Sequence, residues 1–418
     1  MNRQLVYTFS NILQSSLPFL LIPFLAKNLT VEGYGTIGLF QSVAGLFITL
    51  FGLGSVSLLI REYVSKYDKY TILITASFII TIVNSLLMIF VCYFFKSSLV
   101  ELLSIDIFIV YLAVSYSIPI IFINITLVQL HLKDDVVKYV VIQLSHSVLT
   151  VLLSVLLVEF TSLDYLGRII GMIMGAASIS VISLFILIKF KLICFGKVQD
   201  IKNEIRYILK YGCPLLPHII ISFFIGSLDK FYINSQYTSL ILGSYMISFQ
   251  ISNIINVVSL SISKIYQPWF FNQLHNGTKI TELRVYLFLG LLFILLFLLN
   301  LTLQDFYNYG ITFLAGDKYS DVGLLIQLMV VGQLLGGLYQ LLMAKLLFLK
   351  KTSILSKISI FTLIFYMSML YFLPEHYGVI GVILSFLFTW IFRIVLVFYN
   401  IMPIGIEGLK NGKRSSSI

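Results

Sequence analysis

The sequence predicts an all-α protein that crosses a membrane many times. Of its 418 residues, 59% are hydrophobic and only 11% are charged, whereas soluble proteins carry about 25% charged residues. Apolar stretches of about 20 residues, the length that crosses a hydrocarbon core of about 30 Å, recur along the whole chain. The strands of a membrane barrel would instead show short segments of alternating polarity. We therefore expect a polytopic bundle of helices, embedded in the lipid bilayer.

Twelve segments are long and apolar enough to be spans. They lie at about 5–26, 36–60, 72–95, 107–131, 139–159, 166–188, 212–234, 241–264, 285–304, 322–346, 354–373 and 378–401. An even number of spans places both ends of the chain on one side of the membrane.

The distribution of basic residues predicts which side that is. Most of the 28 Lys and Arg residues fall in loops and span ends on the side of the N-terminus. On the opposite side the spans leave Lys27, Lys96, Arg168, Lys230 and Lys318, and Arg393 lies inside the last span. Because cytoplasmic loops carry an excess of positive charge, both termini are expected in the cytoplasm. The net charge of +10 therefore reflects topology, and no nucleic-acid partner is expected.

The longest cytoplasmic connection, FKLICFGKVQDIKNEIRYILKYG, divides the chain almost in half. We expect an N-terminal six-helix bundle at 1–195, an amphipathic linker helix at 196–211, a C-terminal six-helix bundle at 212–402 and a cytoplasmic tail at 403–418. The linker alternates apolar and basic residues at helical spacing, which fits a helix on the anionic inner leaflet. A solvated linker helix fits the pattern equally well.

The two halves are similar in sequence. SLPFLLIPFLAKNLTVEGYGTIGLFQSV can be laid on LLPHIIISFFIGSLDKFYINSQYTSLILGSYMISFQI. Both have a Leu-Pro pair, a short external turn, a Gly/Tyr pair and then Phe-Gln. Internal duplication is typical of transporters, which place their binding sites where the repeats meet.

Polar residues form stripes on three of the predicted spans. One face of the first span carries Asn11, Gln14, Ser15 and Pro18. The eighth carries Gln250, Asn253 and Asn256, and the tenth carries Gln333, Gly336, Gly337 and Gln340. Either these groups bond between helices, or they line a shared watery cavity. Gly167, Gly171 and Gly175 form a ladder of small residues that indicates helix packing alone.

Charged residues inside spans are stronger indicators of function, because inserting one costs at least about 2.5 kcal/mol. Asp229 and Lys230 fall in the outer third of the seventh span. Adjacent residues point about 100° apart on a helix, so the two cannot be explained by pairing with each other. Lys230 can extend toward the interface, whereas Asp229 is too short and either faces a cavity or bonds another helix. We interpret the pair as lining a cavity.

Four further cations end or interrupt spans: Arg61, Lys264, Lys345 and Arg393. Each is explained by the positive-inside rule, but together they would also suit a diphosphate at the cytoplasmic mouth of a cavity. Arg binds phosphate through two parallel hydrogen bonds, and Lys contributes a point charge.

The sequence lacks the motifs of the common enzyme classes. It contains no Walker A, GxSxG, HExxH or CxxC constellation, and its five histidines have no metal-ligand spacing. The external loops are short, whereas a membrane glycosyltransferase or polymerase would be expected to carry acidic pairs or long loops there. We expect no catalytic residues, metal or cofactor, and a transporter rather than an enzyme.

Three short motifs stand out along the chain: FSNILQSSLPFLLIPFLAKNLTVEGYGTIGLFQSV, the REY that closes the second span, and LP…LDKFYI followed by LGSYMISFQI. They resemble motifs of the Wzx-type, or O-antigen, polysaccharide flippases of the multidrug/oligosaccharidyl-lipid/polysaccharide (MOP) exporter superfamily. Pro217, Asp229, Lys230, Gly243 and Tyr245 match the family pattern, with Lys where Arg is frequent. This exchange keeps the charge but weakens the case for bidentate phosphate binding there.

The resemblance implies two six-helix bundles related by a pseudo-twofold axis around a central cavity, the MATE-like MOP fold. It implies a flippase that carries an undecaprenyl-diphosphate-linked oligosaccharide, an O-antigen or similar lipopolysaccharide repeat unit, from the cytoplasmic to the periplasmic leaflet of a bacterial inner membrane. Contact with a polysaccharide polymerase or chain-length machinery is also implied.

Roles for individual residues follow from the resemblance as hypotheses. The diphosphate and sugar would contact Arg61, Lys264, Arg393, Lys230, Asn11, Gln14, Asn253 and Asn256. Asp229 would couple transport to a proton or sodium ion. Two alternatives stay open: a multidrug/cation antiporter of the same superfamily, which would prefer acidic cavity residues, and a polytopic membrane glycosyltransferase or polymerase.

Overall fold

The computed structural model describes residues 3–65, 68–194, 196–276, 279–349 and 351–401. Every regular element in these ranges is helical, which confirms the predicted all-α class. The predicted tail at 403–418 lies outside the described residues. The contacts between residues group into two compact units. Unit 1 comprises residues 1–223 and 230–243, and unit 2 comprises residues 224–229 and 244–418.

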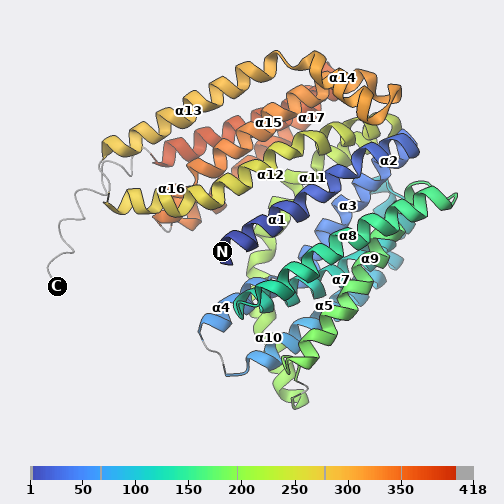
Figure 1. Cartoon of the computed structure of the whole chain (residues 1–418), viewed down its shortest axis with the longest axis vertical. Helices are drawn as coiled ribbons and strands as arrows, with labels where there is room; N and C mark the ends of the chain where they lie inside the picture. Colours follow the sequence, from blue (N-terminus) through green and yellow to red (C-terminus); the bar gives the residue numbers. More distant parts are fainter. Residues whose placement is uncertain (1–2, 66–67, 195, 277–278, 350, 402–418) are drawn as a thin grey trace. The chain divides into compact units, whose positions relative to one another are not determined.

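Unit 1 contains the first ten helices and most of the eleventh (Figure 1). They are α1 (Arg3–Leu20), α2 (Ile22–Asn28), α3 (Val31–Gly52), α4 (Ser55–Val64), α5 (Tyr70–Phe94), α6 (Lys96–Leu103), α7 (Ile107–Leu132), α8 (Val136–Phe160), α9 (Tyr165–Lys189), α10 (Val198–Gly212) and α11 (Leu216–Gln236). Helix α7 packs against α3, α5 and α9, and α8 packs against both α9 and α1.

The glycine ladder of α9 explains the close packing of α8 on α9. A Cβ atom on Gly171 would lie 2.7 Å from the Cα of Ser154, and one on Gly175 would lie 2.9 Å from the Cα of Thr150. Both distances are shorter than side chains tolerate, so only glycine permits the observed approach. The predicted packing role of this ladder agrees with the structure.

Valine at Gly171 should therefore destabilise the protein. Forcing a branched side chain into a filled contact costs about 1–3 kcal/mol, which should lower the thermal unfolding midpoint measured in detergent. The matched control is Gly290→Val in α13, where an added Cβ meets nothing within 4 Å. An equal loss of stability in both variants would contradict the close-packing argument.

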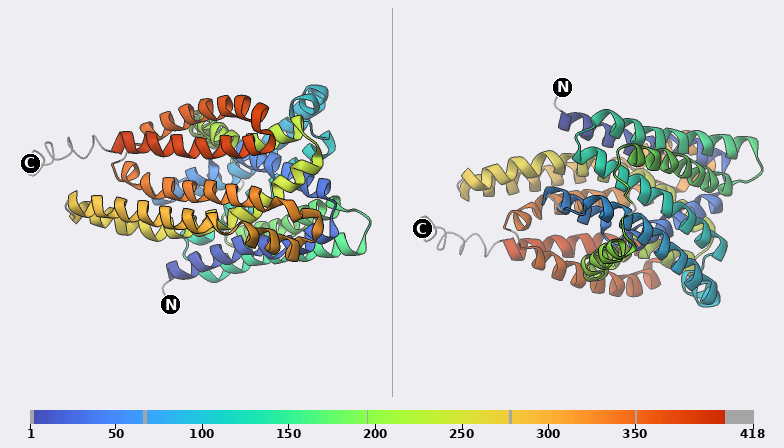
Figure 2. Two further views of the ribbon diagram at one scale, coloured as in Figure 1. Left: turned by 90° about the horizontal axis from the view of Figure 1, so that it is seen from above. Right: turned by 90° about the horizontal axis from the view of Figure 1, so that it is seen from below.

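Unit 2 contains the remaining helices, except residues 239–243 of α12, together with residues 224–229 of α11. They are α12 (Ser239–Asn276), α13 (Lys279–Leu301), α14 (Gln304–Ala315), α15 (Gly323–Leu342), α16 (Ala344–Phe348) and α17 (Thr352–Ile401). Helix α15 packs against α13 and α17. Two glycines of α15 allow aromatic rings of α17 to approach closely, with Gly332 facing Phe386 and Gly336 facing Trp390. Figure 2 shows these helices from two further directions.

The described helices accommodate the twelve predicted spans. Ten segments are long and apolar enough to cross a membrane. One of them is α17, whose 50 residues are interrupted at Gly378 by a positive φ of 56°, a conformation that favours glycine. This break separates the predicted spans 354–373 and 378–401. Helix α11 adds a further 21 residues that cover most of the predicted seventh span.

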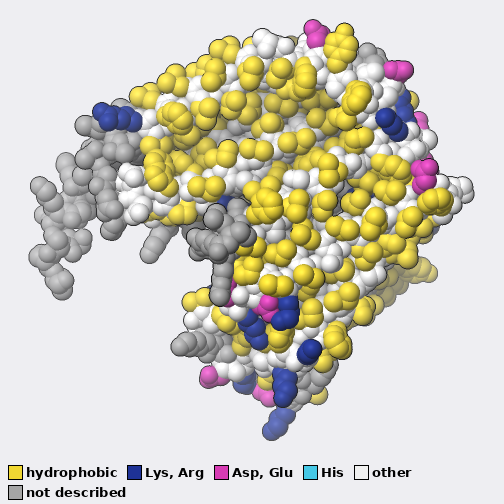
Figure 3. Space-filling view, viewed as in Figure 1, with side chains coloured by type: hydrophobic (Ala, Val, Ile, Leu, Met, Phe, Trp, Pro, Cys, Tyr) yellow, Lys and Arg dark blue, Asp and Glu magenta, His cyan; other side chains and the backbone are white. Residues whose placement is uncertain are grey.

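The surface of the helices is largely apolar, as expected for a protein embedded in lipid. Hydrophobic side chains cover the visible sides of the helices, and Lys and Arg side chains gather at the end of unit 1 that carries α10 (Figure 3). Large apolar residues such as Leu86, Phe160 and Phe288 are more than half exposed. The protein is therefore a multi-pass membrane protein.

The predicted linker helix is present as α10, and it packs on unit 1. Its apolar side contacts α5 and α4, with Ile208 fully buried. Lys69 and Asp200 form an ion pair of 2.8 Å, and the Lys69 ammonium holds the pKa of the Asp200 carboxyl below its usual value. Ile208 thus faces protein, whereas Val198 at the start of α10 is exposed.

Candidate functional site

The polar stripe of α1 is engaged by α8. Gln143 donates from Nε2 to the side-chain oxygens of Asn11 and Gln14, at 2.6 Å each. Its Oε1 accepts from Ser10, and the Tyr139 hydroxyl donates to Asn11 at 3.1 Å. The structure therefore brings Asn11 and Gln14 together in a network that joins two helices. Their role in binding substrate remains a hypothesis.

A pocket of about 400 Å³, with both polar and apolar side chains in its lining, lies beside this network in unit 1. Its lining comes from α1, α3, α7, α8 and α9: Gln14, Ser15, Leu17, Pro18, Gln41, Ala44, Gly45, Ile48, Tyr116, His146, Ser147, Thr150, Val151, Arg168 and Met172. Arg168 was predicted only as a cation of the outer side, and His146 only as one of five histidines without metal-ligand spacing. The only sequence signal for the pair is that each interrupts an apolar helix.

Arg61 lies at the end of α4, and the neighbouring Glu62 carboxylate balances part of its positive charge. Its Nε is 3.2 Å from a carboxylate oxygen of Glu62, and its guanidinium lies 5.7 Å from the ring centre of Tyr211. The side chain is 61% exposed. It is therefore accessible, but any anion that binds it competes with Glu62.

Asp229 and Lys230 are both buried, at 2% and 4% exposure. The Tyr245 hydroxyl, from α12, donates to the Asp229 carboxylate. The fully buried Tyr366 of α17 also interacts electrostatically with this carboxylate. Asp229 is thus bonded to another helix, and the interpretation of Asp229 and Lys230 as lining a cavity stays a prediction.

The motif Gly-x-Tyr has two separate structural roles. A Cβ atom on Gly243 would collide with the backbone of Val31, so glycine is required for the start of α12 to approach α3. Tyr245, two residues later, carries the hydroxyl that binds Asp229. Pro217 is exposed in the first turn of α11.

The polar stripes of α12 and α15 meet in unit 2. Asn256 donates to Asn253 at 3.0 Å, and Gln340 donates to Asn256 at 3.3 Å. The other end of the Gln340 amide, Oε1, is buried with no hydrogen-bond partner among the described residues. This cluster thus retains an unused acceptor.

Arg393 lies between two aromatic rings near the same part of α15. Its guanidinium is 4.4 Å from the ring centre of Tyr339 and 5.3 Å from that of Trp390. Its buried Nε has no acceptor among the described residues. Lys264, on α12, is exposed. Because Arg61 belongs to unit 1 and these two cations to unit 2, their predicted assembly around one diphosphate stays a prediction.

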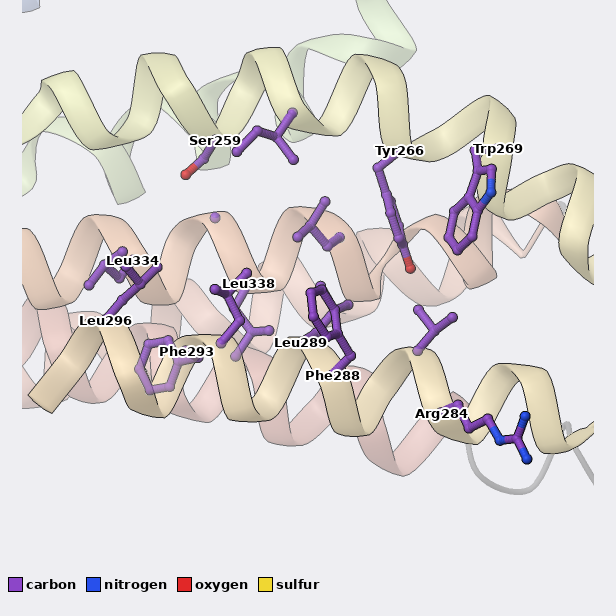
Figure 4. A pocket seen from close by; sticks show the side chains of 15 residues that line it. Ser259, Tyr266, Trp269, Arg284, Phe288, Leu289, Phe293, Leu296, Leu334 and Leu338 are labelled. Carbon is purple, nitrogen blue, oxygen red and sulfur yellow. The ribbon is translucent and has the colours of Figure 1, made fainter.

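An apolar groove of about 460 Å³ runs between α12, α13 and α15 in unit 2. Tyr266 and Trp269 of α12 face Phe288 and other apolar side chains of α13 across it (Figure 4). Arg284 lies at the end of the groove where Trp269 is found, which is the end predicted to be cytoplasmic. The groove suits a hydrocarbon chain, and the guanidinium suits an anionic group at its end.

The described residues offer no group of three or more His, Cys, Asp and Glu side chains that could hold a metal ion.

Comparison with known proteins identifies the family. A family model described as "Polysaccharide biosynthesis protein" matches residues 3–273. The chain belongs to this family. It is also 26% identical over 293 residues to an "Uncharacterized membrane protein" of Haemophilus influenzae, covering 69% of this chain and 70% of that protein.

Solved structures show that this family member has a transporter fold. The chain superposes on an inward-facing multidrug resistance MATE family transporter of the MOP superfamily with a TM-score of 0.70, at 16% identity over 96% of each chain. On the inward closed conformation of the lipid II flippase MurJ the TM-score is 0.76, at 14% identity over 96% of this chain and 87% of that one. The chain therefore has the fold of these transporters, as the sequence predicted.

Proposed function

We propose that this family member is a flippase for an undecaprenyl-diphosphate-linked oligosaccharide, an O-antigen or similar surface polysaccharide repeat unit. It would move the glycan by alternating access from the cytoplasmic to the periplasmic leaflet of a bacterial inner membrane, with both termini in the cytoplasm. A proton or sodium ion coupled through Asp229 would drive the cycle.

The observation that carries this proposal is the groove that ends at Arg284. An undecaprenyl diphosphate is a long hydrocarbon with an anionic head, and the groove offers aromatic and aliphatic walls with one guanidinium at its end. Because phosphate binds a guanidinium through charge-assisted hydrogen bonds, the head would lie near Arg284 while part of the isoprenoid chain occupies the groove. A cation-exporting protein would instead place carboxylates at such an end.

The test is transport in reconstituted vesicles that carry a labelled undecaprenyl-diphosphate-linked oligosaccharide in one leaflet. We expect label to reach the opposite leaflet only in vesicles that contain the protein, and Arg284→Gln to slow this at least about 10-fold. Lys357→Gln, which removes an exposed cation from α17, should transport normally.

Two cellular measurements separate the alternatives. Deletion of a multidrug antiporter would sensitise cells to cationic drugs without loss of surface glycan. Loss of a polymerase would shorten the glycan chains while single repeat units still reached the surface. A flippase deletion should instead abolish export of the repeat unit, and either of the other outcomes would contradict the proposed function.

A further inference from the structure

The pocket of about 400 Å³ in unit 1 contains a buried cation that the proposed transport mechanism does not use. Arg168 of α9 is 5% exposed and lines the pocket. Its Nη1 donates to the Ser154 hydroxyl at 2.6 Å, and its Nε has no acceptor among the described residues. Arginine keeps its proton in proteins, so this is a permanent positive charge in a membrane-spanning helix.

No described side chain in the pocket lining balances that charge, because none of them is acidic. An ionised group removed from water costs several kcal/mol unless an opposite charge or several hydrogen bonds compensate it. A single neutral hydroxyl acceptor compensates only part of that cost. The positive charge of Arg168 therefore has no counter-ion in the described lining of the pocket.

The rest of the lining supplies hydrogen-bonding groups suited to a polyhydroxylated ligand. Thr150 Oγ1 and His146 Nε2 are buried with no partner among the described residues. Gln14, Gln41 and Ser147 add amide and hydroxyl groups. A volume of about 400 Å³ far exceeds the roughly 30 Å³ of a water molecule.

The pocket is open at its rim. Ser15 and Pro18 of α1 and Gln41 of α3 are exposed, whereas Arg168 and Thr150 are buried. A ligand entering past α1 and α3 would thus meet neutral polar groups first and the guanidinium last.

We propose that this pocket binds a carboxylate, with Arg168 as its counter-ion, and that the preferred ligand is a sugar acid. One guanidinium matches one carboxylate in charge and geometry, whereas a diphosphate would bring at least one unmatched charge. The carboxylate could come from an acidic residue of the transported glycan or from a free organic acid. Only the first of these sources rests on the proposed function.

Direct binding to the purified full-length protein in detergent tests the proposal. Sodium glucuronate, sodium acetate and glucose are titrated separately at fixed ionic strength, and binding is followed by ligand-observed saturation-transfer NMR. We expect glucuronate to bind the native protein and neutral glucose to bind at least about 10-fold more weakly. Arg168→Gln should weaken glucuronate binding at least about 10-fold.

Gly45→Leu is a second variant that should block the pocket without disturbing Arg168. Gly45 lines the pocket from α3, and an added Cβ there meets nothing within 4 Å. Leucine also favours helix over glycine, so the variant should fold. Its matched control is Gly290→Leu, an equally open helical glycine outside the pocket. Arg206→Gln, which removes an exposed cation of α10, is the control for net charge.

Each outcome has a defined meaning. Glucuronate binding that is tighter than acetate binding supports the sugar acid. Equal binding of glucuronate and acetate supports the carboxylate site but rejects the sugar assignment. Binding that survives both Arg168→Gln and Gly45→Leu, or no binding of either acid, overturns the proposal. In the last case, vesicles that still move the lipid-linked oligosaccharide would leave the proposed function intact.

Discussion

Replacing Asp229 with Asn should reduce transport of the lipid-linked oligosaccharide at least about 10-fold and remove its dependence on the pH gradient. The two side chains have nearly the same shape, but an amide can neither carry the negative charge nor accept a proton. Asp229 is 2% exposed and bound by the Tyr245 hydroxyl. Ionisable groups in such positions are rare within membrane spans and commonly serve ion coupling. Transport by reconstituted vesicles with and without an imposed pH gradient measures the effect.

Tyr245→Phe separates ion coupling from helix packing at this site. It keeps the ring and removes the hydroxyl, a hydrogen bond to a charged group that contributes about 1.5–3 kcal/mol. Both variants should lower the thermal unfolding midpoint, but only Asp229→Asn should remove the gradient dependence. Asp305→Asn, an exposed carboxylate of α14, should behave as the native protein. Native transport by Asp229→Asn with unchanged gradient dependence would exclude Asp229 from the mechanism.

Replacing Arg393 with Gln should also reduce transport at least about 10-fold, chiefly by weakening the apparent affinity for the substrate. The guanidinium is held between Tyr339 and Trp390, and its Nε has no acceptor among the described residues. The attraction between a cation and the faces of aromatic rings contributes about 2 kcal/mol when the cation is desolvated, and it holds the guanidinium in place. It can therefore bind a phosphate without first becoming ordered.

A purely structural role of Arg393 predicts a different pattern. If the cation only packs between the rings, Arg393→Gln should lower thermal stability while leaving the apparent substrate affinity unchanged. If it binds phosphate, Arg393→Lys should restore part of the affinity, because the point charge remains although the bidentate geometry is lost. Lys357→Gln, an exposed cation of the same helix, controls for the loss of one positive charge.

Most of the architecture could be predicted from the sequence, because the determinants of a membrane span are local. Hydropathy over about 20 residues is a property of a single segment, and the predicted spans correspond to described helices from α1 to α17. The packing role of Gly171 was also predictable, since three small residues at a spacing of four occupy one side of any helix.

The packing of α10 shows where this local information ends. The predicted division at residues 196–211 follows the longest polar connection and stays a prediction, whereas the structure shows that α10 packs on α5 and α4 of unit 1. Hydropathy marks where a chain leaves the membrane. It carries no information on which bundle a linker helix joins.

The class of protein, the positions of its spans and the residue types available for binding all follow from the amino-acid sequence. Which of those residues meet became visible only in the folded protein. Gln143 bridges Asn11 and Gln14 from more than 125 positions away, Tyr245 reaches Asp229 from the next helix, and Arg168 stands in a pocket with no acid in its described lining. The physical reason is that apolarity acts segment by segment, whereas the partner of a polar group depends on how each helix is rotated and packed against distant helices.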